Sequence, residues 1–409
     1  MRYQGINAGN IKMNNRSSIL RLLFAGGPMP RKDIAEEVGL TAASVTLLTS
    51  DLIEEGVLRE LGEAEEEKRA GRKKILLGIN YDYRKVLSID IESEETYIAL
   101  TNLQGEILGQ ETMSTDRSVD AGTFLRQIAE RCDIILEEHH IDKKQVLGVS
   151  VTLPGRVDRA GGRSMNTYSI WTEEVPVGKI LKEALMLPVV VENNLKAYAQ
   201  SEIDFGRGRT EEQLLILKWG PGVGSAIIID HRIYTGSAGM AAEIGHMPSS
   251  EAGRRCNCGR TGCLETEVST HAIIADIEEA YRKDPAAMPL LDARMKDGFR
   301  LTYRNVNAWA TIEDEALGSL LRKKLKLMAH SVRNAVSLLD PDRVIVIGYM
   351  FDVPGVFDEF KRQYALYDAA ADEDFFLRSA LPESMNHTEG LAVLLEELFF
   401  GASAEERNG

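Results

Sequence analysis

The spacing of apolar residues in the first part of the chain predicts three short helices. Residues 14–24 carry isoleucine and leucine at helical spacing, and two glycines and a proline follow soon after. Residues 31–38 are expected to form a second helix, and a third runs from residue 42 to about residue 55 with Thr41 as its N-cap. Three helices in this order, with a glycine turn before the third, predict a helix-turn-helix unit.

Two strand-like segments follow these helices and predict a wing. Residues 57–61 and 73–77 are joined by an acidic turn. A fold of this kind places its third helix in the major groove of DNA, and its basic wing near phosphates or the minor groove. Operator DNA is therefore the expected partner, and the alternative is a three-helix packing module with solvated charges. The candidate DNA-contacting residues are Arg31, Lys32, Ser44, Thr46, Thr49, Arg72 and Lys73.

After residue 80 the pattern changes to strands that alternate with longer helices. The first set is three strands, a helix and a strand, expected at residues 85–91, 95–102, 106–108, 121–139 and 146–151. A similar set of strands and a helix recurs at residues 214–217, 225–229, 317–339 and 343–347. This repetition suggests two ribonuclease-H-like lobes of the actin-like class that close on a cleft.

The expected fold is therefore an α/β two-lobed body that follows a winged helix-turn-helix domain. The predicted domains are residues 1–80 for DNA binding, 81–191 with 385–409 for the first lobe, and 192–384 for the second lobe. The polar segment 283–303 is expected to be a loop inserted between helices. The apolar segment 391–400 is expected to be a closing helix that packs back on the first lobe.

The composition narrows the possible functions. The chain has 409 residues, enough for two or three domains, and its net charge of −15 excludes a broadly basic nucleic-acid coat protein but not a small DNA-binding module. Only Cys132 lies outside one short cysteine cluster, so a disulfide framework is not expected and a reducing cytoplasm fits. The first residues lack the apolar core of a signal peptide, and a membrane-spanning run of about 20 apolar residues is missing.

The cysteine cluster predicts a metal site. His246, Cys256, Cys258 and Cys263 offer one imidazole and three thiolates, a closed four-ligand set that a structural Zn²⁺ prefers. Such a short, spaced cluster in a cysteine-poor chain signals metal, and the alternative is three buried cysteines with an unrelated histidine. The metal would also fix the second ring nitrogen of His246 and the bracketing carboxylates at defined positions beside a pocket.

Residues 243–246 (EIGH) and 256–265 (CNCGRTGCLE) resemble the signature of the ROK family, named for repressors, open reading frames and kinases. In that family the histidine binds zinc with one ring nitrogen and a sugar hydroxyl with the other, while two glutamates also face the sugar. The resemblance extends over nearly the whole chain. It implies a sugar-kinase body that binds a monosaccharide or a sugar derivative, here through Asn193, Asn194, Glu243, His246 and Glu265.

Three departures from the kinases of this family predict that the body is not an enzyme. Those kinases end their first strand in DxGGT, where the glycines let the backbone approach phosphate, whereas residues 90–95 here read DIESEE. Carboxylates beside a triphosphate repel it. The kinases carry their base as the aspartate of an END triplet, and here that position is Asn194. A double glycine that packs adenosine is replaced by Gly348 and Tyr349, so no catalytic residue is assigned.

The sequence thus predicts a sugar-responsive transcription regulator of the xylose-repressor-like kind, which represses carbohydrate-utilisation genes. A homodimer or a dimer of dimers is expected, because a two-fold assembly suits paired half-sites on DNA. Two alternatives stay open at this stage. One is an active ATP-dependent sugar kinase with a DNA-binding arm, and the other is a regulator whose signal is a protein partner.

Overall fold

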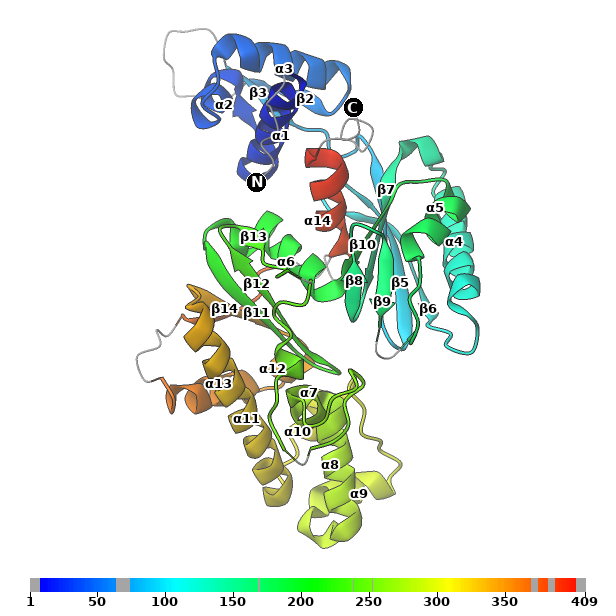
Figure 1. Ribbon diagram of the computed structural model, residues 1–409, viewed down its shortest axis with the longest axis vertical. Helices are drawn as coiled ribbons and strands as arrows, with labels where there is room; N and C mark the ends of the chain where they lie inside the picture. Colours follow the sequence, from blue (N-terminus) through cyan, green and yellow to red (C-terminus); the bar gives the residue numbers. More distant parts are fainter. Residues whose placement is uncertain are drawn as a thin grey trace. The chain divides into compact units, whose positions relative to one another are not determined.

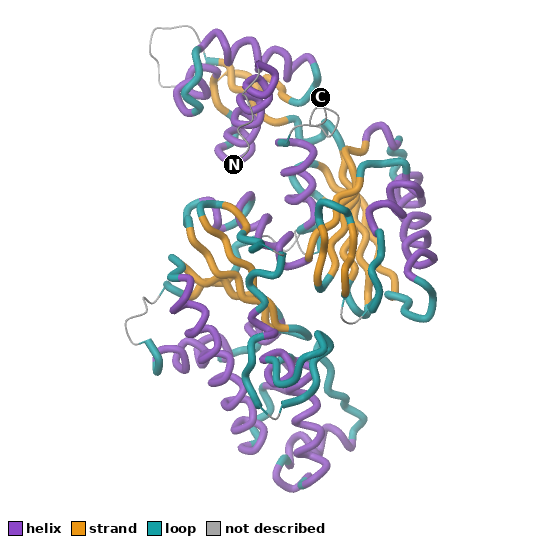
Figure 2. The backbone as a smooth tube through the Cα atoms, in the orientation of Figure 1, coloured by secondary structure: helices purple, strands orange, loops and turns teal. Residues whose placement is uncertain are grey.

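The computed structural model describes residues 8–63, 74–167, 170–237, 239–251, 253–368, 374–381 and 387–401. The chain forms two compact units (Figure 1). Unit 1 contains Met1–Phe205 and Pro382–Gly409, and unit 2 contains Gly206–Leu381. Each unit has its own five-stranded sheet with helices packed on it, as Figure 2 shows by colour. None of the helices among the described residues has the length and apolar content needed to cross a membrane.

The N-terminal part of unit 1 is the predicted winged helix. Its elements are α1 (Ala8–Gly26), β1 (Met29–Pro30), α2 (Arg31–Glu37), α3 (Ala42–Glu54), β2 (Leu58–Glu63) and β3 (Ile75–Ile79). β3 lies between β1 and β2 and is antiparallel to both. The Thr41 hydroxyl accepts a hydrogen bond from the Ser44 N–H at 3.2 Å and caps α3 as predicted. Arg72 and Lys73 lie outside the described residues, so their contacts with DNA stay a prediction.

The rest of unit 1 is built on a sheet with the strand order β10-β7-β4-β5-β6. Its strands are β4 (Lys85–Ile91), β5 (Glu95–Asn102), β6 (Ile107–Ser114), β7 (Val146–Leu153) and β10 (Val189–Asn193). The β4–β5 and β5–β6 pairs are antiparallel, whereas β7 runs parallel to both β4 and β10. This meander followed by parallel strands is the predicted ribonuclease-H-like lobe, with each apolar strand buried because helices cover it on two faces.

Helices cover both faces of this sheet (Figure 1). One face carries α4 (Ala121–Glu138) and α5 (Val177–Leu185), and the other carries α6 (Asn194–Asp204) and α14 (Gly390–Leu394). The smaller elements of this lobe are η1 (Lys143–Gln145), β8 (Arg156–Asp158) and β9 (Arg163–Asn166). The division between the units falls after Phe205, whereas the sequence began the second lobe at residue 192, because α6 packs against α14.

Unit 2 has a sheet with the strand order β13-β12-β11-β14-β15. Its strands are β11 (Gln213–Trp219), β12 (Val223–Ile229), β13 (Arg232–Ile233), β14 (Arg343–Ile347) and β15 (Phe376–Arg378). Its helices are η2 (Arg207–Arg209), η3 (Ile244–His246), α7 (Leu264–Val268), α8 (Thr270–Lys283), η4 (Pro285–Ala287), α9 (Pro289–Lys296), α10 (Val306–Ala310), α11 (Glu315–Leu339), α12 (Tyr349–Asp352) and α13 (Val356–Ala365).

One prediction for unit 2 was wrong. Residues 283–303 are not a plain loop, because they contain η4 and α9. Leu291 and Leu301 are buried in the core of the unit, so the segment packs as part of it. Its proline residues sit at the first positions of these two helices, where a missing N–H costs no hydrogen bond.

The C-terminal segment joins the winged helix to the first lobe, and its predicted closing helix is confirmed. α14 continues as a six-residue π-helix, η6 (Leu395–Phe400). Arg21 of α1 donates two hydrogen bonds to Glu396, at 2.6 and 2.7 Å, and its guanidinium lies over the ring of Phe400. Both helices contribute to one hydrophobic cluster, which includes Ile19, Leu20, Leu23, Leu391, Leu394, Leu395, Phe399 and Phe400.

Candidate functional site

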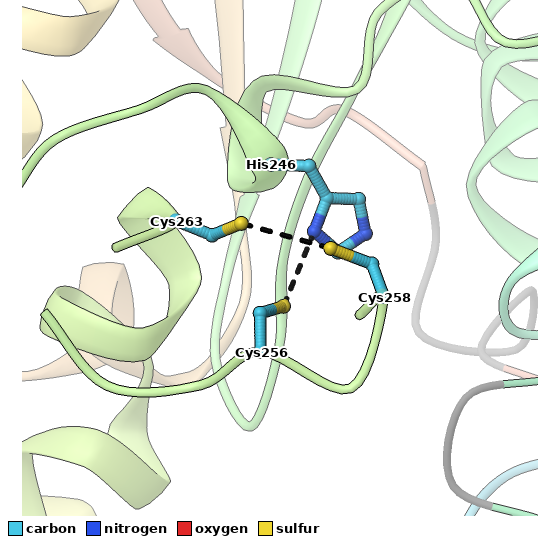
Figure 3. A group of neighbouring side chains, drawn as sticks. All are labelled: His246, Cys256, Cys258 and Cys263. Carbon is cyan, nitrogen blue, oxygen red and sulfur yellow. Dashed lines mark hydrogen bonds between the residues drawn. The ribbon is translucent and has the colours of Figure 1, made fainter. Parts of the chain in front are cut away.

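Four side chains of unit 2 converge as a metal site would require (Figure 3). The ligand atoms of His246, Cys256, Cys258 and Cys263 all lie within 4.8 Å of one another. The Cys256 Sγ is 3.6 Å from His246 Nδ1, and the Cys258 Sγ is 3.6 Å from the Cys263 Sγ. A tetrahedral zinc with bonds of about 2.3 Å to sulfur separates its ligands by roughly 3.7 Å, so the donor set fits this ion.

The backbone between the cysteines fixes this arrangement. Gly262 has a φ of +71°, and a Cβ at this position would lie 1.8 Å from the Ser250 carbonyl oxygen. The Cys256 N–H donates to the Arg260 carbonyl at 2.8 Å and closes the turn that carries Cys258. Residues 256–263, called the knuckle below, therefore hold their thiols in place through main-chain hydrogen bonds. They also require glycine at position 262, because any Cβ there would clash with the Ser250 carbonyl.

The pKa values of two of these side chains bear on metal binding. Burial lowers the pKa of His246, and the positive charge of Arg260 lowers it further, so the imidazole is neutral and able to coordinate. Burial is the largest of the causes that raise the pKa of the Cys256 thiol to about 12, and its interactions with the Cys258 and Cys263 thiols raise it further. A coordinating dication reverses that preference, because it stabilises the thiolate directly.

Two carboxylates lie beside the knuckle. Glu243 Oε2 is 3.8 Å from His246 Nε2, the ring nitrogen that points away from Cys256. The Glu265 carboxylate accepts a hydrogen bond from the Val223 N–H at 3.0 Å. Burial raises the pKa of Glu265, which this hydrogen bond opposes and the nearby charge of Glu243 supports. The sequence did not indicate Val223, and its amide shows that the glycine-rich turn before β12 holds a carboxylate.

The two predicted amide ligands lie in unit 1, at the start of α6. The Asn193 side chain caps this helix, because its Oδ1 accepts from the N–H groups of Leu195 and Lys196 at 3.0 and 3.1 Å. Its Nδ2 donates to the Gly155 carbonyl at 2.8 Å. The Asn194 Nδ2 donates to Glu92 Oε1 at 3.1 Å. Asn193 thus fixes the start of α6, and Asn194 pairs with the residue that replaces a kinase glycine; contact of either amide with a sugar stays a prediction.

A second pairing at this end of the sheet involves Asp90, which is 3% exposed. Its carboxylate accepts from the Thr152 hydroxyl at 2.8 Å and contacts His387 Nδ1 at 2.7 Å. The imidazole stacks on Tyr97 with ring centroids 3.6 Å apart. Burial opposes a charge on His387, but the hydrogen bond to Asp90 and the surrounding carboxylates outweigh it and raise its pKa. This contact joins residues 297 positions apart and was not predicted from the sequence.

The predicted DNA-reading helix α3 needs one correction. Thr49 is fully buried, its hydroxyl donates to the Val45 carbonyl at 2.8 Å, and it accepts from Arg31 Nε at 3.1 Å. It follows Val45 by four positions and so shares the inward row of that residue. Arg31 also donates to Glu60 at 3.2 Å, so its side chain ties α2, α3 and β2 together, and its contact with DNA stays a prediction.

The other described candidates remain at the surface of the winged helix. Lys32 is exposed and lies 3.6 Å from Glu36 on its own helix. Thr46 is exposed, and Ser44 is half-buried beside Thr41. Leu47, which the sequence did not single out, is 63% exposed on the same helix.

Known proteins resemble this chain along most of its length. The model of the ROK family matches residues 86–397, and the model described as winged helix-turn-helix DNA-binding matches residues 14–59. The xylose repressor of Caldicellulosiruptor bescii is 29% identical over 273 residues, 67% of this chain and 68% of that protein. The DNA-binding transcriptional dual regulator NagC of Escherichia coli K12 is 26% identical over 347 residues, 84% of this chain and 82% of that protein.

An enzyme also resembles this chain, as does a solved regulator. A glucokinase of Halalkalibacterium halodurans is 28% identical over 266 residues, 65% of this chain and 80% of that protein. The crystal structure of a ROK family transcriptional regulator, a homologue of the E. coli MLC protein, gives a TM-score of 0.80 at 22% identity. It covers 95% of this chain and 97% of that chain, which supports the fold described above.

Proposed function

Because the chain belongs to the ROK family, we propose that it is a sugar-responsive transcriptional repressor whose kinase-like body does not catalyse phosphoryl transfer. The winged helix binds operator DNA, and the body binds the effector. The observation that carries this proposal is the hydrogen bond between Asn194 and Glu92 in a chain that also has a winged helix. Two of the positions that a kinase of this family needs are thereby paired with each other.

The chemistry of these positions argues against transfer. An amide such as Asn194 does not accept the proton of a sugar hydroxyl, and loss of a general base costs about 10²–10⁴ in rate. Asp90 is bonded to Thr152 and His387. The carboxylate of Glu92 stands where the resemblance places a phosphate-binding glycine, so it repels the anion that a kinase attracts.

The proposed effector is a monosaccharide or a sugar derivative, since two relatives are named xylose repressor and N-acetylglucosamine repressor. In unit 2 its proposed contacts are Glu243, His246 and Glu265; a contact of the sugar with Asn193 or Asn194 of unit 1 stays the prediction that the family resemblance implies. Carboxylates and amides suit vicinal hydroxyls, because a buried hydroxyl left without a partner costs about 1–3 kcal/mol. A structural Zn²⁺ held by His246 and the three cysteines would supply no reaction step; it would fix the ring that faces Glu243.

Contacts inside unit 1 link the proposed effector residues to the DNA-binding domain. Arg159 Nη1 lies 3.4 Å from the carboxylate of Glu192, the residue before Asn193. Its Nη2 lies 3.3 Å from the carboxylate of Glu397 in η6. The same π-helix holds α1 through the hydrogen bonds between Glu396 and Arg21. We propose that sugar binding changes the affinity for the operator through these contacts, and that the size of this change is the coupling free energy between the two sites.

The test is a pair of measurements on the purified full-length chain. Calorimetry against xylose, N-acetylglucosamine and glucose should find one ligand, and Glu243→Ala should weaken its binding more than tenfold. Glu278→Ala, an exposed acid on α8, is the matched control and should leave binding unchanged. A coupled assay with ATP and the same sugars should show no turnover above background, and turnover near the roughly 1–100 s⁻¹ of ordinary kinases would contradict the proposal.

The same material distinguishes the remaining alternatives. A chain that binds duplexes from its own promoter region but none of the sugars would favour a protein signal. Light scattering in solution reports whether it forms the proposed homodimer or dimer of dimers. Metal analysis checks for zinc, and a Cys258→Ser variant that keeps full metal content would reject the four-ligand site.

A further inference from the structure

The exposed face of α3 has an unusual composition for a helix that reads DNA. Its exposed positions are Ala42, Ala43, Thr46, Leu47, Ser50 and, at the C-terminal end, Glu54, which recur at helical spacing. The whole helix, AASVTLLTSDLIE, contains no arginine, lysine, asparagine or glutamine. These four are the side chains that recognise guanine or adenine through paired hydrogen bonds. Direct readout by α3 must therefore use another kind of contact.

Two hydroxyl groups in the N-terminal part of α3 are already engaged. The Thr46 hydroxyl donates to the Ala42 carbonyl at 2.7 Å. The Ser44 hydroxyl lies 2.8 Å from that of Thr41, which caps the helix. With these groups hydrogen-bonded locally, the part of the face from Ala42 to Leu47 presents mainly methyl groups to its surroundings.

Leu47 has the longest side chain on this face and is 63% exposed. Its neighbours Val45, Leu48 and Leu52 are buried in the core of the domain, so the hydrophobic packing of α3 does not use Leu47. In the major groove the apolar group of a base pair is the 5-methyl group of thymine, and apolar side chains recognise it by contact.

Resting on the proposed function, we propose that Leu47 reads thymine in each half-site through contact with its 5-methyl group. Leu47 is then the residue of α3 that discriminates between bases, and the shorter side chains around it allow the helix close approach to the groove. The expected gain is about fourfold in affinity for each methyl group that the contact buries.

Selection from random duplexes with the full-length chain tests this assignment. The wild-type chain should enrich thymine at one position of each half-site, and Leu47→Ala should lose that enrichment while keeping the rest of the consensus. Leu47→Gln should enrich adenine at the same position, because glutamine forms paired hydrogen bonds with adenine. Leu338→Ala removes a leucine that is 84% exposed on α11 and is the matched control, with an unchanged consensus expected.

Replacing that thymine by uracil in the selected duplex then removes only the methyl group. Wild-type affinity should fall about fourfold for each half-site, whereas Leu47→Ala should bind both duplexes equally. Circular dichroism of the variants shows whether they remain folded. The assignment is overturned if Leu47→Ala keeps the same consensus and the same loss with uracil. A wild-type chain that enriches no sequence overturns the proposed function, and the role of Leu47 with it.

Discussion

Replacing Arg159 by alanine should weaken the communication between effector and operator. This guanidinium is the group that contacts both Glu192, beside the proposed sugar contact Asn193, and Glu397 in the π-helix. Without it, Glu192 keeps the hydrogen bond from the Asn193 N–H at 2.8 Å, but its other oxygen loses its charged partner. The π-helix η6 in turn loses the ion pair between Glu397 and Arg159.

The exposure of the three side chains sets the size of the effect. The Glu192 side chain is 8% exposed, whereas those of Arg159 and Glu397 are 33% and 35% exposed. Breaking a fully buried pair costs about 3–5 kcal/mol, and an exposed pair contributes about 0–1 kcal/mol. An intermediate loss of about 1–2 kcal/mol in stability follows for Arg159→Ala. If about 1 kcal/mol of it belongs to the coupling, the effect of the sugar on operator affinity shrinks about fivefold.

Fluorescence anisotropy with a labelled operator, with and without saturating sugar, measures this ratio of affinities directly. Arg163→Ala is the control, because Arg163 lies on neighbouring β9 and pairs with Asp158 and Glu174 at 2.6 and 2.7 Å, away from η6. The control should keep the wild-type ratio. An Arg159→Ala chain that stays folded and keeps the full ratio would refute the proposed route, and so would an equal loss in both variants.

Three other changes follow from the structure. Gly262→Ala should lose zinc and unfold at a lower temperature, because its Cβ would clash with a carbonyl; Gly298→Ala, at a φ of +90° with open space, should keep its metal. The raised pKa of His387 means that its pairing with Asp90 stabilises the fold below pH 6.5 and is lost as the pH rises through the folded-state pKa. Thermal melts should therefore show that His387→Gln destabilises the chain more at pH 5.5 than at pH 9, and equal losses would contradict this. Thr49→Val should cost about 1 kcal/mol in denaturant titrations by removing a buried hydrogen bond, yet leave the selected DNA consensus unchanged, since Thr49 faces inward.

The sequence was sufficient wherever the signal was local. The helical periodicity and the N-cap Thr41 predicted the helices of the winged helix. The spacing of the cysteines predicted the cluster of His246, Cys256, Cys258 and Cys263. The sequence was insufficient for Thr49. A small polar residue on a helix looks like a surface residue, and only the structure shows that Thr49 is buried on the same face as Val45. It also failed for residues 283–303, where polar character concealed the two buried leucines that dock α9 and its flank.

Contacts between distant segments could not be predicted at all. Glu92 and Asn194 are separated by 102 positions, and Asp90 and His387 by 297. In the sequence, Glu92 and Asn194 looked like two separate losses of kinase residues, and His387 was not singled out. Only the folded structure shows that Glu92 pairs with Asn194 and that Asp90 pairs with His387. The sequence thus indicated which kinase residues are missing, whereas the structure shows that the side chains in their places, Glu92 and Asn194, form a hydrogen bond with each other.

The apolar cluster shared by α1 and the C-terminal segment has a consequence for biosynthesis. Arg21 and Glu396 are 375 positions apart, so the packing of α1 is completed only after the segment that contains Glu396 has been synthesised. A chain without that segment would expose the apolar residues of α1 that pack against it, and exposed apolar surface is prone to aggregation. Stable packing of the DNA-binding helices is thereby tied to synthesis of α14 and η6.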